Sequence, residues 1–145
     1  MLIHSDTIKL LRECNAGIKM GVSSISDVVD HVRDTDMYKI LEKSRQEHNK
    51  LGSQTRKLLN RYHDAGKEPN PIAKGMSWMK TNIKLTVNDT DATVAELMTD
   101  GCNMGVKSLS RYLNQYKAAE EEVKDITKKL IKLEEQLSVD MRSYL

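Results

Sequence analysis

Apolar residues recur every three or four positions through most of this chain, which is the spacing of one face of an α-helix. The recurrence runs from Ile8 to Val32, from Met37 to Tyr62, from Val94 to Tyr116 and from Val123 to Met141. None of these stretches shows the apolar and polar alternation that marks a half-buried strand. The chain is therefore predicted to be all-α, with four helices packed as a bundle.

Polar and helix-breaking residues between these stretches set the predicted helix limits. We expect helices over residues 6–33, 36–65, 91–117 and 119–143, in a single domain that spans residues 1–145. The last boundary has no Gly, Pro or Asp, but Lys117 suits a helix end and Glu120 suits a helix start. Without a turn there, residues 91–143 would form one helix that pairs with a second chain.

The connection between the second and third helices is long. Pro69 and Pro71 interrupt the chain, and Pro71 suits the first position of a helix. Ile72, Met76 and Ile83 then recur at helical spacing, which predicts a short helix over residues 71–87. Such a helix would cover roughly 25 Å, so the connection can cross from one end of the bundle to the other.

Three short motifs accompany this order of helices. Asn15, Ala16 and Gly17 lie in the first helix, His48 lies in the middle of the second, and Trp78 precedes the third. With two helix pairs joined by one long crossover, the chain resembles the ferritin-like four-helix bundles. More narrowly, it is similar to the uncharacterised bacterial ferritin-like domains. The resemblance covers nearly the whole chain and implies a ferritin-like fold.

The metal ligands of ferritin-like proteins are not reproduced in this sequence. Di-metal members use a Glu from each of two helices and a Glu-x-x-His motif from each of the other two. Here Arg45 stands three residues before His48, and Asn15 stands where the first helix would need a Glu. We therefore expect no metal site and no cofactor, with an atypical metal-binding protein as the alternative.

The fourth helix has the most apolar stripe of the four. Leu130 and Leu133 are expected to face the interior, and Leu→Ala at either position is expected to destabilise by about 2–5 kcal/mol. Asp100 on the third helix and Glu134 on the fourth fall outside the predicted inward stripes. They are not expected to supply ligands.

Four polar residues occupy inward positions of the first two helices. They are Asn15, Ser44, His48 and Thr55. We interpret them as a hydrogen-bonded layer that fixes the register of the helices. Exposure of His48 to solvent and a metal contact that includes Glu47 are the alternatives. Burial disfavours a charged imidazole, so the pKa of His48 is expected to lie below about 6.5.

Two pairs of glycines are spaced four residues apart, which places each pair on one helix face. They are Gly17 with Gly21 and Gly101 with Gly105. Small residues at this spacing let a neighbouring helix approach closely. We expect close packing within the bundle, with a subunit interface as the alternative.

The balance of positive and negative residues does not indicate any class of partner. The chain has 23 Lys and Arg against 21 Asp and Glu, unlike the one-signed surface of a dedicated nucleic-acid binder. Basic residues do gather near the end of the second helix, at Lys50, Arg56, Lys57, Arg61 and Lys67. Weak binding to nucleic acid or another anionic surface is therefore kept as an alternative, although a nucleic-acid partner is not expected.

No apolar run reaches the roughly 20 residues that span a bilayer, and Asp6 and Lys9 lie where a signal peptide would be apolar. We therefore expect a cytoplasmic protein without a membrane partner. Cys14 and Cys102 are expected to be buried free thiols, because disulfides are rare in that compartment.

No catalytic grouping can be recognised, so the protein is not expected to be an enzyme. We expect a structural or protein-interaction module of unknown role and unknown protein partner. A homodimer is expected because several apolar residues beside the stripes would widen the apolar faces beyond one bundle. These residues are Met20, Met37, Tyr38, Ile40, Leu85 and Ile131.

Overall fold

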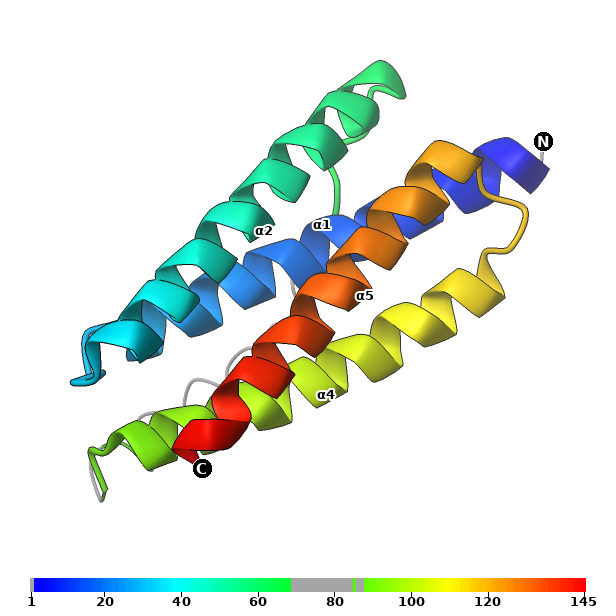
Figure 1. Ribbon diagram of the computed structural model, residues 1–145. Helices are drawn as coiled ribbons and strands as arrows, with labels where there is room; N and C mark the ends of the chain where they lie inside the picture. Colours follow the sequence, from blue (N-terminus) through cyan, green and yellow to red (C-terminus); the bar gives the residue numbers. More distant parts are fainter. Residues whose placement is uncertain (1, 69–84, 86–87) are drawn as a thin grey trace.

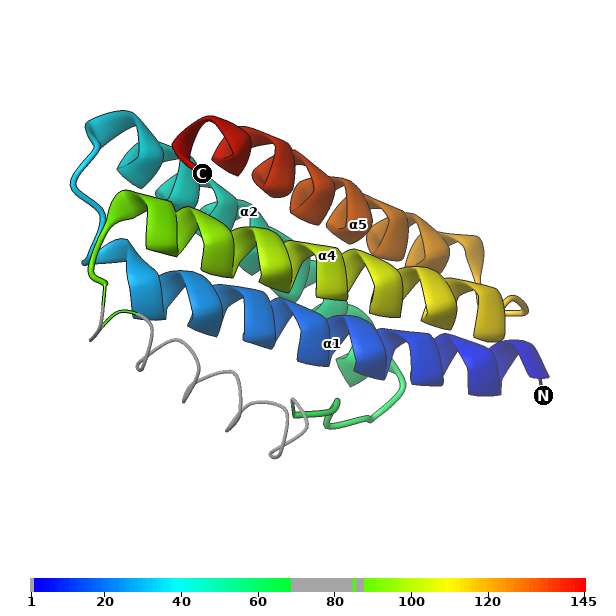
Figure 2. The same cartoon turned by 90° about the horizontal axis from the view of Figure 1, so that it is seen from below.

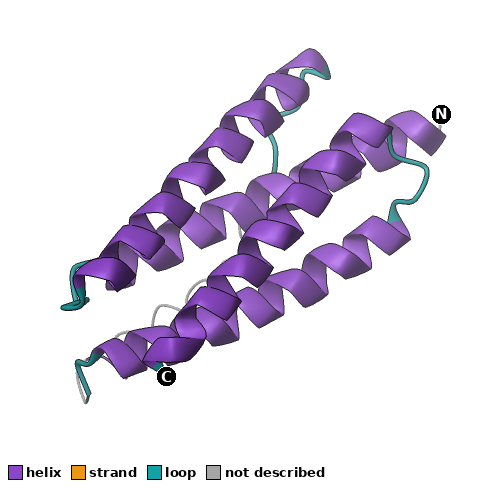
Figure 3. Cartoon of the chain, in the orientation of Figure 1, coloured by secondary structure: helices purple, strands orange, loops and turns teal. Residues whose placement is uncertain are grey.

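The structure is a computed structural model that describes residues 2–68, 85 and 88–145. Within these residues the chain forms four α-helices and one short 3-10 helix (Figure 1). The α-helices are α1 (Leu2–Val29), α2 (Thr35–Arg61), α4 (Asp91–Gln115) and α5 (Glu121–Met141), and the 3-10 helix is η1 (Arg142–Tyr144). The described part of the chain contains no strand (Figure 3), which confirms the all-α prediction.

The helix limits follow capping groups more closely than apolar periodicity. The Asp34 side chain accepts a hydrogen bond of 2.9 Å from the Met37 N–H and begins α2. The Thr90 hydroxyl accepts one of 3.2 Å from the Thr93 N–H and begins α4. At the other end of α2, His63 has a φ of 55°, in the left-handed region that ends a helix.

The predicted start of α4 is correct, the predicted starts of α1 and α2 come too late in the sequence, and the remaining predicted limits make the helices too long. α1 ends at Val29 rather than residue 33, and α2 ends at Arg61 rather than residue 65. A turn separates Gln115 from Glu121, so α4 and α5 are two helices and the single long helix is ruled out. The short helix predicted over residues 71–87 lies outside the described residues, apart from the buried Leu85.

Hydrogen bonds at both ends of the bundle fix the directions of the helices. At one end, Asp91 at the start of α4 accepts a 2.8 Å hydrogen bond from the Arg33 N–H, just before α2. At the other end, the Glu120 N–H before α5 donates to the Thr7 hydroxyl at 2.9 Å, close to the start of α1. α2 and α4 therefore run in one direction, and α1 and α5 run in the other (Figure 1).

The connection between α2 and α4 joins opposite ends of the bundle as a consequence. α2 ends at Arg61, and α4 begins at Asp91 beside the loop that precedes α2. α2 has 27 residues, and the connection therefore has to return over a length of about 40 Å. The predicted long connection between the second and third long helices is thus present.

Each helix has two flanking neighbours. α1 and α5 both pack against α2 and α4, and α1 and α5 also touch across the centre. Figure 2 shows α1 and α4 side by side. The buried apolar residues form two clusters, one near each end. The first holds Ile25, Met37, Leu41, Val94 and Leu137, and the second holds Leu10, Leu51, Leu109 and Leu130. The stretch of α2 between Leu41 and Leu51 therefore lies between two apolar regions.

Some of the residues that suggested a dimer belong to the core of the single chain. Met37 is completely buried and Leu85 is 6% exposed, both in the first cluster. Ile40 and Ile131 are partly buried against the two clusters. Of the six residues, Tyr38 has the most open side chain, at 44% exposed.

No helix in the described ranges is long and apolar enough to cross a membrane.

Candidate functional site

The centre of the bundle holds an ion pair between two buried side chains. The Nε2 atom of His48 on α2 lies 2.8 Å from the Oε1 atom of Glu134 on α5. His48 is completely buried, and Glu134 is 8% exposed. The other ring nitrogen, Nδ1, donates to the backbone carbonyl of Ser44 at 2.8 Å, one helical turn earlier. Both ring nitrogens are therefore engaged, one by each of two helices.

These contacts favour a charged imidazole. Burial alone lowers the pKa of His48, but the hydrogen bond to Glu134, its negative charge and the Ser44 carbonyl together raise it. The net direction is upward, so the expected downward shift of the His48 pKa was wrong. The physical reason is the carboxylate of Glu134, a residue that lies outside the predicted inward stripe of the fourth helix.

Glu134 is the partner of His48 that the apolar spacing of the sequence did not identify. It is buried, whereas Leu133 is only partly buried against the second cluster. Glu134 lies four residues after Leu130 and three before Leu137, which is also helical spacing. Hydrophobicity favours Leu133 over its charged neighbour as the inward residue. The predicted inward face of α5 is therefore displaced by one residue from the observed face.

Two glycines and a cysteine border the ion pair. A Cβ atom on Gly21 of α1 would lie 2.6 Å from His48 Nε2, so α1 can approach the ring only where this side chain is absent. A Cβ atom on Gly105 of α4 would make ordinary contact with Glu134 at 3.6 Å. Burial raises the pKa of the Cys102 thiol, and the charge of Glu134 adds to the rise. All four long helices therefore contribute to this region.

The four residues interpreted as a polar layer are all buried, but their hydrogen bonds do not connect them into one network. Ser44 and His48 are joined through the Ser44 carbonyl. Thr55 donates to the Leu51 carbonyl within α2 at 2.8 Å. Asn15 donates to the Lys67 carbonyl at 2.9 Å and accepts from Arg56 at 3.2 Å. Asn15 therefore fastens the chain after α2 to α1 rather than joining His48.

The cysteines are free and buried, as predicted. The Cys14 Sγ atom lies 3.1 Å from the Thr127 hydroxyl, and burial raises the pKa of this thiol to about 11. The thiolate is the reactive form, so the Cys14 thiol is unreactive near neutral pH.

Metal-ligating side chains are not clustered in the part of the chain that the structure describes. No group of three or more His, Cys, Asp or Glu residues within it is placed to hold a metal ion. Arg45, which occupies the place of a motif carboxylate, instead forms an ion pair of 2.6 Å with Glu42 on its own helix.

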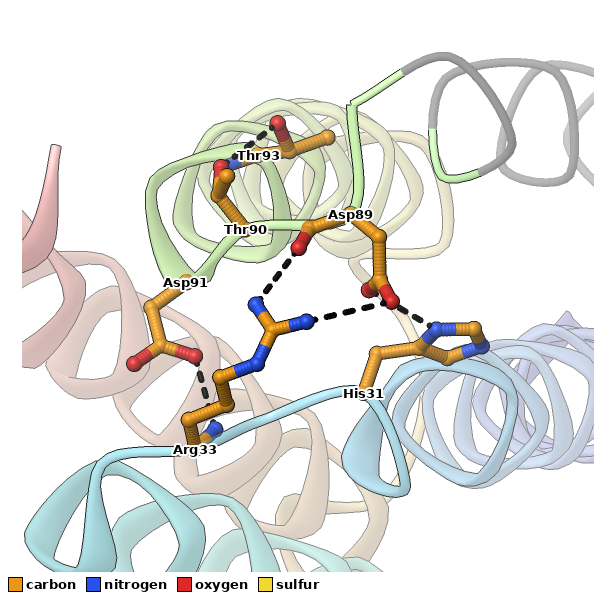
Figure 4. A network of polar contacts seen from close by, with 6 residues as sticks. All are labelled: His31, Arg33, Asp89, Thr90, Asp91 and Thr93. Atoms are coloured by element: carbon orange, nitrogen blue, oxygen red, sulfur yellow. Dashed lines mark hydrogen bonds and ion pairs between the residues drawn. The ribbon is translucent and has the colours of Figure 1, made fainter.

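A second polar network fastens the start of α4 to the loop between α1 and α2 (Figure 4). Asp91 accepts from the N–H groups of Arg33 and Asp34, at 2.8 and 3.0 Å. Asp89 lies 3.0 Å from His31 Nδ1, and its carbonyl accepts from Arg33 at 2.6 Å. This network links the residues just before α4 to the loop between α1 and α2, and we interpret it as structural.

A shallow groove of about 630 Å³ lies between α1 and α2 on the outside of the bundle. We call it the α1–α2 groove, and it is bordered by residues 15–23 of α1 and residues 49–57 of α2. Ile18 and Val22 contribute apolar surface to it, and Lys19, Arg56 and Lys57 contribute positive charge. It is separate from the buried ion pair.

Two further grooves lie between α2 and α5. The first, of about 200 Å³, is lined by Ile40, Ser44, Leu133 and Leu137 among others. The second, of about 270 Å³, includes Leu58 and Ile126 together with residues of both charges. The surface along α2 is therefore hollowed on both sides.

Comparisons of the chain with models of protein families, with curated proteins and with solved structures found no match.

Proposed function

We propose that this protein is a non-enzymatic helical bundle of ferritin-like arrangement that acts through its outer surface, as a structural or protein-interaction module. The observation that carries the proposal is the His48–Glu134 ion pair at the position where the bundle could have held a reactive centre. Its polar atoms are engaged by other parts of the same chain. Three grooves lined by described residues, by contrast, lie on the surface along α2.

The ferritin-like part of the proposal is supported by helix order and direction. α1 and α2 form one antiparallel pair, α4 and α5 form another, and one long connection joins the pairs from end to end. The ferritin-like bundles have the same single long crossover. α1 beside α4 and α2 beside α5 complete the arrangement.

The ion pair supports a structural role for the centre. A protonated imidazole has no lone pair for a metal, and the raised pKa of His48 favours that form. Gly21 leaves no space for another atom against Nε2 on the α1 side, because even a Cβ would lie 2.6 Å away. A buried pair whose partners lie on α2 and α5 instead favours one alignment of these two helices over others.

Elemental analysis of protein purified without chelators tests the proposal. We expect iron, manganese and zinc far below one ion per chain in the wild type, in His48→Ala and in the control His63→Ala. His63 suits the control because it is an exposed histidine beyond the end of α2. A stoichiometric metal in the wild type that is lost in His48→Ala alone would contradict the proposal and favour the atypical metal-binding alternative.

Self-association is the part of the proposal that concerns quaternary structure. Tyr38 on α2 and Met104 on α4 are exposed apolar side chains, at 44% and 66%. We propose a homodimer that covers such residues, which sedimentation at micromolar concentration tests. Observation of monomer alone would remove the dimer and leave the rest of the proposal standing.

A further inference from the structure

The α1–α2 groove combines an apolar base with a positively charged border. Ile18 is 4% exposed and Val22 is partly buried, so both have lost most of their contact with water. At Gly52 a Cβ atom would lie 3.2 Å from Ile18 Cγ2, which shows how closely α1 and α2 approach beneath the groove. The absence of a side chain at Gly52 keeps this part of the groove open.

Three cationic residues line the groove, and none of the described residues that line it is acidic. Lys57 is exposed. Lys19 forms an ion pair with Glu68, which lies outside the lining. Positive charge therefore exceeds negative charge at the groove border.

Arg56 is oriented by hydrogen bonds to two uncharged acceptors. Its guanidinium donates to the Ala65 carbonyl at 3.0 Å and to the Asn15 side-chain oxygen at 3.2 Å. Both acceptors are neutral, and they orient the guanidinium. The pKa of the nearby Asp64 carboxylate is lowered by its hydrogen bond with Arg12 and, to a smaller extent, by the charge of Arg56, but the ion pair of Asp64 is with Arg12. An oriented Arg loses little conformational entropy on binding a carboxylate, which is a form of pre-organisation.

We propose that the α1–α2 groove binds an acidic amphipathic helix of a partner protein. The apolar residues of that helix would contact Ile18 and Val22, and its carboxylates would pair with Arg56, Lys57 and Lys19. A helix that lays its apolar face into a groove between two helices is a recurring mode of recognition. The inference rests on the proposed protein-interaction role and names the chemistry of the partner.

The composition of the groove favours such a helix over a nucleic acid. Single-stranded nucleic acids are usually held by aromatic side chains on which bases stack, as well as by cations. Residues that line the groove within the described ranges are aliphatic, amide, hydroxyl or cationic, with no aromatic ring among them. An apolar base with cations at its border therefore matches an amphipathic acid better than a polyphosphate.

Fluorescence anisotropy with two labelled synthetic helical peptides tests the inference. One peptide carries Leu on one face and Glu beside it, and the other has Lys in place of every Glu. We expect the full-length protein to bind the acidic peptide and to bind the basic peptide at least about tenfold more weakly, a difference of about 1.4 kcal/mol. Binding of the acidic peptide should weaken as salt is added, because the pairing charges lie at the surface.

Two variants and a matched control locate the binding. Lys57→Glu should weaken binding of the acidic peptide at least about tenfold, or about 1.4 kcal/mol. Ser53→Trp should weaken it by filling the groove with a neutral side chain, since Ser53 is exposed and lines the groove. Lys107→Glu makes the same charge change at an exposed position of α4, away from the groove, and should leave binding unchanged. Thermal melts of all variants establish that each is folded.

Three results would overturn the inference. They are no binding of the acidic peptide by the wild type, equal weakening by Lys57→Glu and Lys107→Glu, and displacement of the peptide by a tighter-binding single-stranded oligonucleotide. Each of these outcomes leaves the metal analysis of the wild type and His48→Ala unaffected. Failure of the groove inference is thus distinguishable from failure of the proposed function.

Discussion

His48 on α2 and Glu134 on α5 form an ion pair of 2.8 Å in the interior of the bundle, 86 residues apart in the sequence. Apolar clusters lie on both sides of the pair, and glycines on α1 and α4 border it. The pair is therefore a specific link between two antiparallel helices rather than a surface contact. Its strength, protonation and steric surroundings can each be tested separately.

The first prediction concerns the loss of one partner. Glu134→Leu is expected to lower the free energy of unfolding by about 3–5 kcal/mol, because it leaves the buried imidazole without its counter-charge. The double variant His48→Leu with Glu134→Leu is expected to lose less than the sum of the two single variants, since no buried group then lacks a partner. Urea unfolding of the four proteins gives the coupling energy, and simple additivity would show that the two side chains act independently.

The second prediction concerns the pH dependence of stability. Because the pKa of His48 is raised on folding, the native state holds this proton more tightly than the unfolded chain. The stabilisation is therefore complete below about pH 6.5, the ordinary value, and is lost as pH rises through the raised pKa. This direction reverses the one expected when burial is considered alone.

Urea unfolding between pH 6 and pH 9 checks this direction. The stability of the wild type is expected to decline with rising pH more steeply than that of His48→Gln. Among the described groups around the ring, Glu134 supplies the opposing charge and Cys102 carries a thiol whose pKa is raised, so that it stays neutral over this range. His63→Gln, which removes an exposed histidine, should retain the slope of the wild type. An equal slope in His48→Gln and the wild type would contradict the assignment.

The third prediction concerns the close approach of α1 to the ring. Gly21→Ala would place a Cβ atom 2.6 Å from His48 Nε2, and the ring cannot move away without lengthening its two hydrogen bonds. We expect a loss of about 1–3 kcal/mol, as for overpacking in a tight core. Gly101→Ala is the matched control on α4, because a Cβ atom there meets nothing within 4 Å. It should be neutral or stabilise by up to about 1 kcal/mol, as expected when Ala replaces Gly in a helix.

Helix positions and the all-α class were predictable because apolar spacing is repeated over many turns. Helix ends were less predictable, since apolar contacts continue beyond the helices. Val32 lies in the loop after α1 yet packs against the first cluster, and Tyr62 does the same against the second cluster after α2. A periodic apolar stripe indicates which residues are buried. Residues beyond the last helical hydrogen bond can also be buried, so the stripe does not mark the end of the helix.

Only one of the two side chains of the central ion pair could be predicted from the sequence. His48 stood at an inward position among apolar residues, so its burial could be inferred from spacing. Its partner could not be chosen in the same way, because Leu133 and Glu134 both fit the helical spacing of α5. Hydrophobicity favoured Leu133, whereas the need of a buried histidine for an acceptor would have favoured Glu134. The pKa of His48 followed this choice and was predicted with the wrong sign.

The fourth prediction separates the two leucines that the sequence treated alike. Leu130 is completely buried in the second cluster, and Leu130→Ala is expected to destabilise by about 2–5 kcal/mol through lost apolar contact and a residual cavity. Leu133 is only partly buried and lines the first groove between α2 and α5. Water can enter the space left by Leu133→Ala, so that variant is expected to lose less than about 1.5 kcal/mol. Urea unfolding of both variants side by side measures the difference. Equal losses of several kcal/mol would mean that Leu133, and not Glu134, faces the interior, and the His48–Glu134 ion pair would then be wrong.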